Sequence, residues 1–208
     1  MFSSMIHCTS EYFTSCGLTI WQPAKGHRYG PESLALADFV RAGEGVRIAE
    51  LGSGVGVIAL LIASRTKGAA VYAVEIQDSL HAIAVRNVKG NGYERSVTCV
   101  NDDYRRFAAE NRNAFDLVVS NPPFYAAGPG RMSPNSQRAQ ARHEINGTVA
   151  DVVKAARDLL VSGGKFAVVF ARRRVGELRR AAVDAGLEEN RIEEPESGSF
   201  LLLEFQKN

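Results

Sequence analysis

Short apolar runs alternate with amphipathic stretches through most of the chain. The apolar runs predict strands, mostly buried on both faces: VRIAEL (46–51), AVYAVE (70–75), SVTCV (96–100), FDLVVS (115–120) and KFAVVF (165–170). The stretches between them have helical periodicity. SLHAIAVRNVKGNG (79–92) is expected to end at its Gly-Asn-Gly, and TVADVVKAARDLLVSGG (148–164) at Gly163-Gly164. This alternation predicts an α/β fold with a mostly parallel sheet and helices on both faces.

The two ends of the chain depart from this alternation. VGELRRAAVDAG (175–186) predicts a helix, LEENRIEEP (187–195) a weak strand and SFLLLEF (199–205) a strong one. Two strands without a helix between them predict a hairpin, which places an antiparallel strand in the sheet. Near the N-terminus, GLTIWQP (17–23) predicts an edge strand, and Pro31 is expected to be the first helical residue of PESLALADFV (31–40). We expect one domain over residues 1–208, with an irregular segment over 1–30 and the core over 31–208.

The composition is that of a globular protein and excludes several classes. Of 208 residues, 45% are hydrophobic and 23% charged, and the net charge of +2 is too small to indicate a nucleic-acid partner by itself. Cys8, Cys16 and Cys99 show no CxxC spacing, so neither a zinc ribbon nor a disulfide framework is expected. The segment 1–24 contains no Lys or Arg, and no apolar run approaches membrane-spanning length. We expect a cytoplasmic protein without signal peptide, membrane span or metal site.

A glycine-rich loop, ELGSGVG (50–56), follows the first buried strand and precedes the helical VIALLIAS (57–64). Gly52, Gly54 and Gly56 allow a sharp turn and close approach of a ligand, and the helix start is expected to offer free N–H groups. The spacing is neither GxGxxG nor GxxxxGK[ST], so it indicates neither the dinucleotide fingerprint nor a phosphate loop. By itself, such a loop is weak evidence of a ligand-binding site.

Acidic residues follow the next two strands. Glu75 ends the second strand, where its carboxylate can accept both hydroxyls of a ribose; the alternative is a solvated carboxylate. Asp102 or Asp103, after the third strand, can accept from an adenine amino group, although Asp is also an ordinary turn residue. Open sheets of this kind bind ligands at the carboxyl ends of their strands, so these groups are expected to face one crevice.

These strand ends resemble the S-adenosylmethionine-dependent methyltransferases of the Rossmann-like class I. Their loop E/D-x-G-x-G-x-G is matched by Glu50, Gly52, Gly54 and Gly56. The resemblance implies a mostly parallel seven-stranded sheet with an antiparallel last strand, and S-adenosyl-L-methionine as cofactor. The implied cofactor-binding residues are Glu50, Gly52, Ser53, Gly54, Gly56, Glu75, Ile76, Asp102, Asp103 and Asn121.

The run Asn121-Pro122-Pro123-Phe124 follows the fourth strand. A planar amino group is a poor nucleophile because its lone pair is delocalised, and two acceptors, the Asn121 side-chain oxygen and the Pro122 carbonyl, can hold its N–H bonds. The prolines fix the backbone, and Phe124 offers a face for stacking, worth about 1–3 kcal/mol per base. The alternative is a structural Pro-Pro turn. The run resembles the [D/N/S]-P-P-[Y/F/W] motif of amino-methyltransferases, which implies catalytic roles for all four residues. It leaves the substrate open among adenine N6, cytosine N4, guanine N2 and a glutamine amide.

Two flanking stretches resemble the bacterial adenine N6-methyltransferases that modify valine tRNA. The matching positions are Gln22, Gly26, Arg28, Tyr29, Glu32, Leu34 and Ala35, then Arg138, Ala141, Arg142, His143 and Glu144, with His27 at a usually aromatic position and Glu32 at a usual Asp. This resemblance implies an RNA substrate, expected to be tRNA. The expected substrate-binding residues are Arg28, Tyr29, Phe124, Arg131, Arg138, Arg142 and His143. The arginines suit phosphate contacts, as do those of ARRRVGELRR (171–180), and solvated surfaces are the alternative for both segments.

Four rival functions remain. A methyltransferase for the glutamine amide of a peptide release factor usually carries a helical domain ahead of the core, and only the short segment 1–30 precedes the core here. Enzymes for guanine N2 in rRNA commonly have a duplicated domain, and many small-molecule methyltransferases lack the Pro-Pro motif. The non-enzymatic rival is an RNA-binding scaffold with a degenerate cofactor pocket, against which Gly52, Gly54, Glu75 and Asn121 argue. The sequence does not indicate the oligomeric state.

Overall fold

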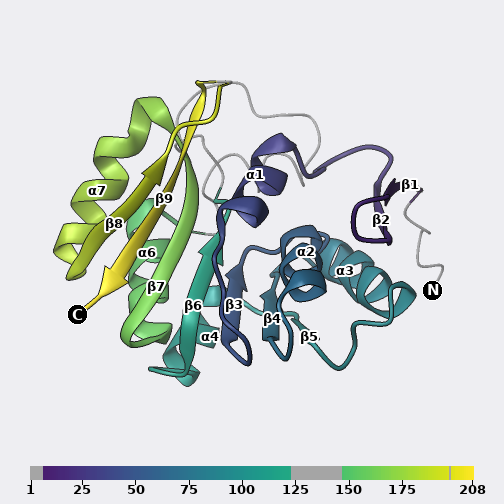
Figure 1. Ribbon diagram of the computed structural model, residues 1–208, viewed down its shortest axis with the longest axis horizontal. Helices are drawn as coiled ribbons and strands as arrows, with labels where there is room; N and C mark the ends of the chain where they lie inside the picture. The colour runs from purple at the N-terminus through teal and green to yellow at the C-terminus, as the bar shows by residue number, and fades with distance from the viewer. Residues whose placement is uncertain (1–6, 123–146, 197) are drawn as a thin grey trace.

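A central sheet with helices on both faces forms the body of the protein (Figure 1). The computed structural model describes residues 7–122, 147–196 and 198–208. In these ranges the main sheet has seven strands in the order β5-β4-β3-β6-β7-β9-β8. Their bounds are β3 Arg47–Leu51, β4 Ala70–Val74, β5 Val97–Val100, β6 Phe115–Ser120, β7 Leu160–Ala171, β8 Leu187–Glu193 and β9 Phe200–Lys207. β3 to β7 are parallel to one another and β9 is antiparallel to both β7 and β8, which confirms the predicted fold class.

The central strands bury both faces because apolar side chains point alternately to two helical layers. In β3, Ile48 packs into one layer, while Ala49 and Leu51 pack into the other. The first layer contains α1 (Pro31–Phe39), α2 (Val57–Arg65) and α3 (Asp78–Gly90). The second contains α4 (Tyr104–Glu110), α6 (Val149–Leu159) and α7 (Val175–Asp184), which follows the short 3₁₀ helix η1 (Arg172–Arg174). No helix in the described part of the chain is long and apolar enough to cross a membrane.

The helix predicted over 148–164 is shorter than expected. It begins after Thr148, whose side chain and that of Asp151 form a capping box, and it ends at Leu159. Leu160 has extended backbone geometry, is buried, and pairs with Phe115 at the start of β7. The Gly163-Gly164 pair therefore lies within a strand and does not end the helix.

The prediction of an irregular segment over 1–30 is wrong for residues 8–23. β1 (Cys8–Phe13) and β2 (Leu18–Pro23) form an antiparallel hairpin separate from the main sheet, so 17–23 is not an edge strand of that sheet. The hairpin lies beside α3 (Figure 1). Two asparagine side chains bind the backbone of β2: Asn91, which follows α3, bonds both N–H and C=O of Thr19, and Asn87 of α3 does the same for Trp21.

Candidate active site

The glycine loop and Asn121 follow the ends of two adjacent strands, β3 and β6. Leu51 of β3 pairs with Ser120 of β6, and the Ser120 hydroxyl donates to the Leu51 carbonyl at 2.9 Å. The next residues, Gly52 and Asn121, therefore begin adjacent loops at the carboxyl edge of the sheet. This is the edge where open parallel sheets bind their ligands.

The glycine loop is held by the protein's own backbone. Gly52, Gly54 and Gly56 have φ of 73°, 56° and 78°, a region that favours glycine. The N–H groups of Gly52 and Ser53 donate to the Val74 carbonyl at 3.0 and 2.9 Å. A methyl group at Gly52 would meet no atom within 4 Å, whereas one at Gly56 would lie 3.3 Å from the Ala84 side chain. The open side of the loop is therefore at Gly52, and Gly56 serves packing against α3.

Glu75 lies directly after β4 and is 5% exposed. Its Oε2 accepts from the Gly54 N–H and its Oε1 from the Gln77 N–H, each at 2.8 Å. A carboxylate oxygen has two acceptor positions, so each keeps capacity for a further donor. Burial raises the pKa of Glu75, and the hydrogen bonds from Gln77 and Gly54 oppose this rise.

Glu50 is more deeply buried, at 2% exposure, and supports a helix start. Its carboxyl accepts from the Ala59 N–H in the first turn of α2 at 2.9 Å. Burial raises the pKa of Glu50 to about 8, and the nearby charge of Glu75 adds to the rise. The expectation of free N–H groups at this helix start is therefore wrong for Ala59. Glu50 thus supports the first turn of α2, which directly follows the glycine loop.

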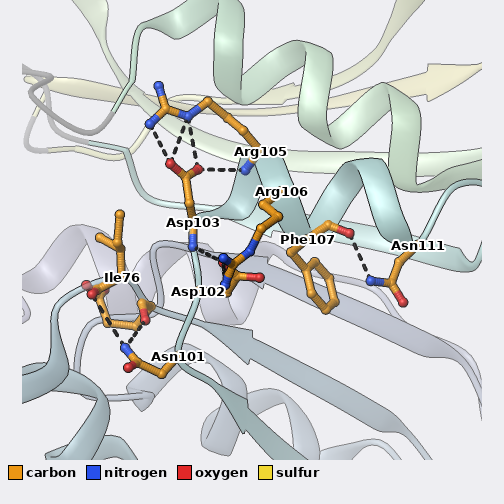
Figure 2. Close-up of polar contacts among 9 residues, drawn as sticks. Ile76, Asn101, Asp102, Asp103, Arg105, Arg106, Phe107 and Asn111 are labelled. Carbon is orange, nitrogen blue, oxygen red and sulfur yellow. Dashed lines mark hydrogen bonds and ion pairs between the residues drawn. The ribbon is translucent and has the colours of Figure 1, made fainter.

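The two aspartates after β5 have different surroundings (Figure 2). Asp103 caps α4: it accepts from the Arg105 N–H at 2.8 Å and from the Arg105 guanidinium, which lowers its pKa. Asp102 accepts from the Asp103 N–H and forms an ion pair with Arg106, both at 2.6 Å. Asn101 donates to the carbonyls of Glu75 and Ile76, so the loops after β4 and β5 are tied together (Figure 2). Asp103 thus caps the helix and Asp102 pairs with Arg106, and contact of either with an adenine amino group stays a prediction.

Asn121 contacts a residue far away in the sequence. Its Nδ2 donates to the hydroxyl of Ser33 in α1 at 2.9 Å, and Ser33 is 4% exposed. Pro122 is buried. Pro123 and Phe124, and the predicted substrate residues Arg131, Arg138, Arg142 and His143, lie outside the described residues.

The N-terminal substrate candidates contact the hairpin. Arg28 donates to the Thr9 hydroxyl and to the Pro23 carbonyl, each at 2.8 Å. The Tyr29 hydroxyl donates to Glu11 at 2.6 Å, and burial raises the pKa of Tyr29. These contacts give both residues a structural role, and their predicted contact with substrate stays a prediction.

The arginines after β7 have acidic partners. Arg172 forms an ion pair with Glu194, and Arg174 with Glu177 at 2.8 Å. These pairs offset the positive charge expected of 171–180 and weaken its interpretation as a phosphate-binding segment.

Ser33 and Asn87 are the site-supporting residues that sequence reasoning missed. Asn87 lies on the apolar side of α3, four residues after Ile83, and is fully buried. Its Nδ2 donates to the carbonyls of Trp21 and Val55, so one side chain connects the hairpin to the glycine loop. A polar residue on the apolar face of a helix is a usable signal, because buried amides need partners. No comparable pattern marks Ser33.

The strand order with antiparallel β9, the glycine loop after β3 and the carboxylate after β4 define the class I S-adenosylmethionine-dependent methyltransferases. The chain belongs to the methyltransferase small domain family, which matches residues 30–179. Within the described ranges, no group of three or more His, Cys, Asp or Glu residues is arranged to hold a metal ion.

Three known proteins illustrate the similarity. A tRNA1(Val) (adenine(37)-N6)-methyltransferase of Bacteroides fragilis is 28% identical over 163 residues, which are 78% of this chain and 68% of that protein. The crystal structure of TrmN from Thermus thermophilus has a TM-score of 0.64 at 21% identity, over 85% of this chain and 48% of that one. A geranyl diphosphate methyltransferase in complex with SAM has a TM-score of 0.63 at 13% identity, over 85% and 84% of the two chains. The two structures support the fold alone.

Proposed function

We propose that this methyltransferase transfers a methyl group from S-adenosyl-L-methionine to an exocyclic amino group of a nucleic-acid base, specifically N6 of adenine in tRNA. The observation that carries the proposal is the pairing of Leu51 with Ser120, which places Asn121 beside the start of the glycine loop. Asn121, which is proposed to accept a hydrogen bond from the amino group of the substrate, therefore lies next to the predicted cofactor site.

The residues at the carboxyl edge fit the cofactor. Glu75 has acceptor capacity for the two ribose hydroxyls, and the open side of Gly52 allows close approach of a ligand. Ile76, which is 39% exposed, offers an apolar face for the adenine, and Asp102 an acceptor for its amino group. Glu50 accepts from the Ala59 N–H in the first turn of α2, and the Ser53 N–H donates to the Val74 carbonyl, so both residues support the loop. When bound, the cofactor supplies an electrophilic methyl group on a sulfonium.

Asn121 and Pro122 act on the substrate by orientation. The Asn121 oxygen and the Pro122 carbonyl accept the two N–H bonds of the planar amino group and turn its lone pair out of conjugation. Because both acceptors are fixed, they need no reorganisation during the reaction, and this lowers the activation free energy of methyl transfer. Phe124 adds a stacking face for the base, which must leave its own stack to reach the site.

The relatives favour RNA over the other acceptors. The Bacteroides protein is named for adenine 37 of a valine tRNA, and its match covers 78% of this chain. The substrate contacts proposed for Arg28, Tyr29, Arg131, Arg138, Arg142 and His143 belong to this hypothesis, as does a cytoplasmic location. The ion pairs of Arg172 and Arg174 weaken the case for phosphate contact at 171–180.

The experiment is incubation of the purified protein with total bacterial RNA and methyl-labelled S-adenosylmethionine, followed by digestion to nucleosides. Label is expected in N6-methyladenosine, and Asn121→Ala serves as the control that removes it. Label in N2-methylguanosine would assign the guanine alternative, and label only in protein would assign the glutamine alternative. A protein that binds no cofactor would leave only the RNA-binding scaffold.

A further inference from the structure

Ser33 lies at the start of α1 and contacts Asn121. The helix begins with Pro31, and the Ser33 N–H donates to the Gly30 carbonyl at 3.0 Å. Ser33 is 4% exposed and lies far before Asn121 in the sequence, and its hydroxyl accepts from Asn121 Nδ2 at 2.9 Å. The contact therefore joins the N-terminal part of the chain to the end of β6.

The two ends of an asparagine amide have nearly the same shape and opposite chemistry. An amino group in the site needs an acceptor, and only the Oδ1 end provides one; the NH₂ end would place donor against donor. A partner that takes up the NH₂ end therefore directs the oxygen elsewhere. In this structure the partner of Nδ2 is Ser33.

We propose that Ser33 is a positioning residue: its hydroxyl holds the Asn121 amide with Nδ2 inward, so that Oδ1 faces the amino group of the substrate. The inference rests on the proposed function, because it assigns the acceptor role to Asn121. It extends the machinery of methyl transfer to α1, outside the glycine loop and the Asn-Pro motif. It applies to any planar amino group, whichever base or amide is the substrate.

The test compares turnover and cofactor binding in Ser33→Ala and Ser33→Cys. Cysteine keeps the size of the buried side chain but is a weak acceptor. Both variants are expected to lose turnover by at least about 10-fold, because misorientation of one group by a small distance already costs this much or more. The dissociation constant for S-adenosylmethionine and the unfolding midpoint of Ser33→Cys should stay near those of the native protein. Ser64→Ala is the matched control: it removes a hydroxyl bonded within α2 to the Leu61 carbonyl and should keep native turnover.

A second readout separates positioning from a general structural role. Asn121→Asp replaces the amide by a carboxylate, whose two ends both accept and which a hydroxyl can hold by donating. Either oxygen of the carboxylate can accept from the amino group of the substrate. Ser33→Ala should therefore reduce turnover far less in the Asn121→Asp background than in the native one. If Asn121→Asp has no turnover, the turnover of Ser33→Ala and Ser33→Cys in the native background alone tests the positioning role.

The outcomes distinguish this inference from the proposed function. Native turnover on guanine or on a protein amide would contradict the proposed substrate, and the Ser33 comparison would then be made on that acceptor. Native turnover that is unchanged in Ser33→Ala and Ser33→Cys would overturn the positioning role alone. A loss of cofactor affinity parallel to the loss of turnover would also overturn it. Absence of methyl transfer from the native protein to any of these acceptors would overturn both.

Discussion

The carboxylate of Glu75, at the end of β4, holds Gly54 at the centre of the glycine loop through a hydrogen bond of 2.8 Å from the Gly54 N–H. The carboxylate that is proposed to bind the ribose thus also shapes the loop beside it. The predicted consequence is that Glu75→Gln weakens binding of S-adenosylmethionine by about 10- to 100-fold, since hydrogen bonds to a charged acceptor are worth about 1.5–3 kcal/mol. Isothermal titration calorimetry measures this loss. Glu94→Gln, at an exposed position before β5, is the control, and an unchanged affinity in Glu75→Gln would contradict the ribose role.

Asn121→Ala should separate chemistry from cofactor binding. Loss of one preorganised polar group typically costs about 100- to 1000-fold in turnover. The dissociation constant for the cofactor should change little, because the glycine loop and Glu75 are untouched. Single-turnover methyl transfer and calorimetry on the same preparation provide the two values. Turnover equal to that of the native protein would remove Asn121 from the mechanism.

Glu50 should make the stability of the cofactor-free protein depend on pH. Its pKa is about 8 in the folded state, against 4.5 for an ordinary glutamate. Between these values the folded state binds more protons than the unfolded one, so the contribution of Glu50 to the free energy of unfolding is greatest below pH 4.5 and falls as the pH rises through 8. The fall is up to about 5 kcal/mol. Urea unfolding of the native protein and of Glu50→Gln across this range measures the difference, and equal pH profiles would refute a raised pKa.

The glycines of the loop should respond differently to alanine. Gly52→Ala and Gly56→Ala both force a side chain into the left-handed region, at a cost of about 1–2 kcal/mol. Gly56→Ala also crowds Ala84 and should destabilise the protein more. Gly52→Ala extends into the open side of the loop and should cost more in cofactor affinity. Thermal unfolding and calorimetry on both variants test this order, and the reverse order would mean that the open side is not the ligand side.

Asn87→Ala should be strongly destabilising. It leaves three backbone groups without their partner: the N–H and C=O of the half-buried Trp21 and the C=O of the buried Val55. Each buried unsatisfied group costs about 1–3 kcal/mol, so we expect a loss of about 3 kcal/mol or more in the free energy of unfolding. Denaturant unfolding is the measurement. Asn91→Ala, at a half-buried position bonded to Thr19, is the matched control and should cost less.

The sequence predicts the main sheet well because its strands carry their signal locally. The apolar runs over 46–51, 70–75 and 115–120 match β3, β4 and β6 to within a residue, since fully buried strands need continuous apolar side chains. The end of α6 is less predictable because Leu159 and Leu160 satisfy helical and extended patterns equally. Only the pairing of Leu160 with Phe115, distant in sequence, decides between them.

Only one strand of the N-terminal hairpin could be predicted from its own residues, β2 from GLTIWQP. CTSEYF in β1 is mostly exposed and shows no apolar face. Its partner β2 is anchored by Asn87 and Asn91, which are far away in the sequence. The glycine conformations at the site followed from residue type alone. The hydrogen bonds made by the N–H groups of this loop could not be predicted in this way. Their acceptors, the Val74 carbonyl and the Glu75 carboxylate, belong to β4 and to the residue after it.

The Asn87 side chain binds Trp21 of the hairpin and Val55 of the glycine loop at the same time. The hydrogen bonds that this side chain makes to one partner therefore depend on the position of the other. We therefore expect removal of the hairpin to disturb the position of Val55 in the glycine loop. The β1–β2 hairpin, although it lies outside the main sheet, is thus expected to help hold the loop that is proposed to bind the cofactor.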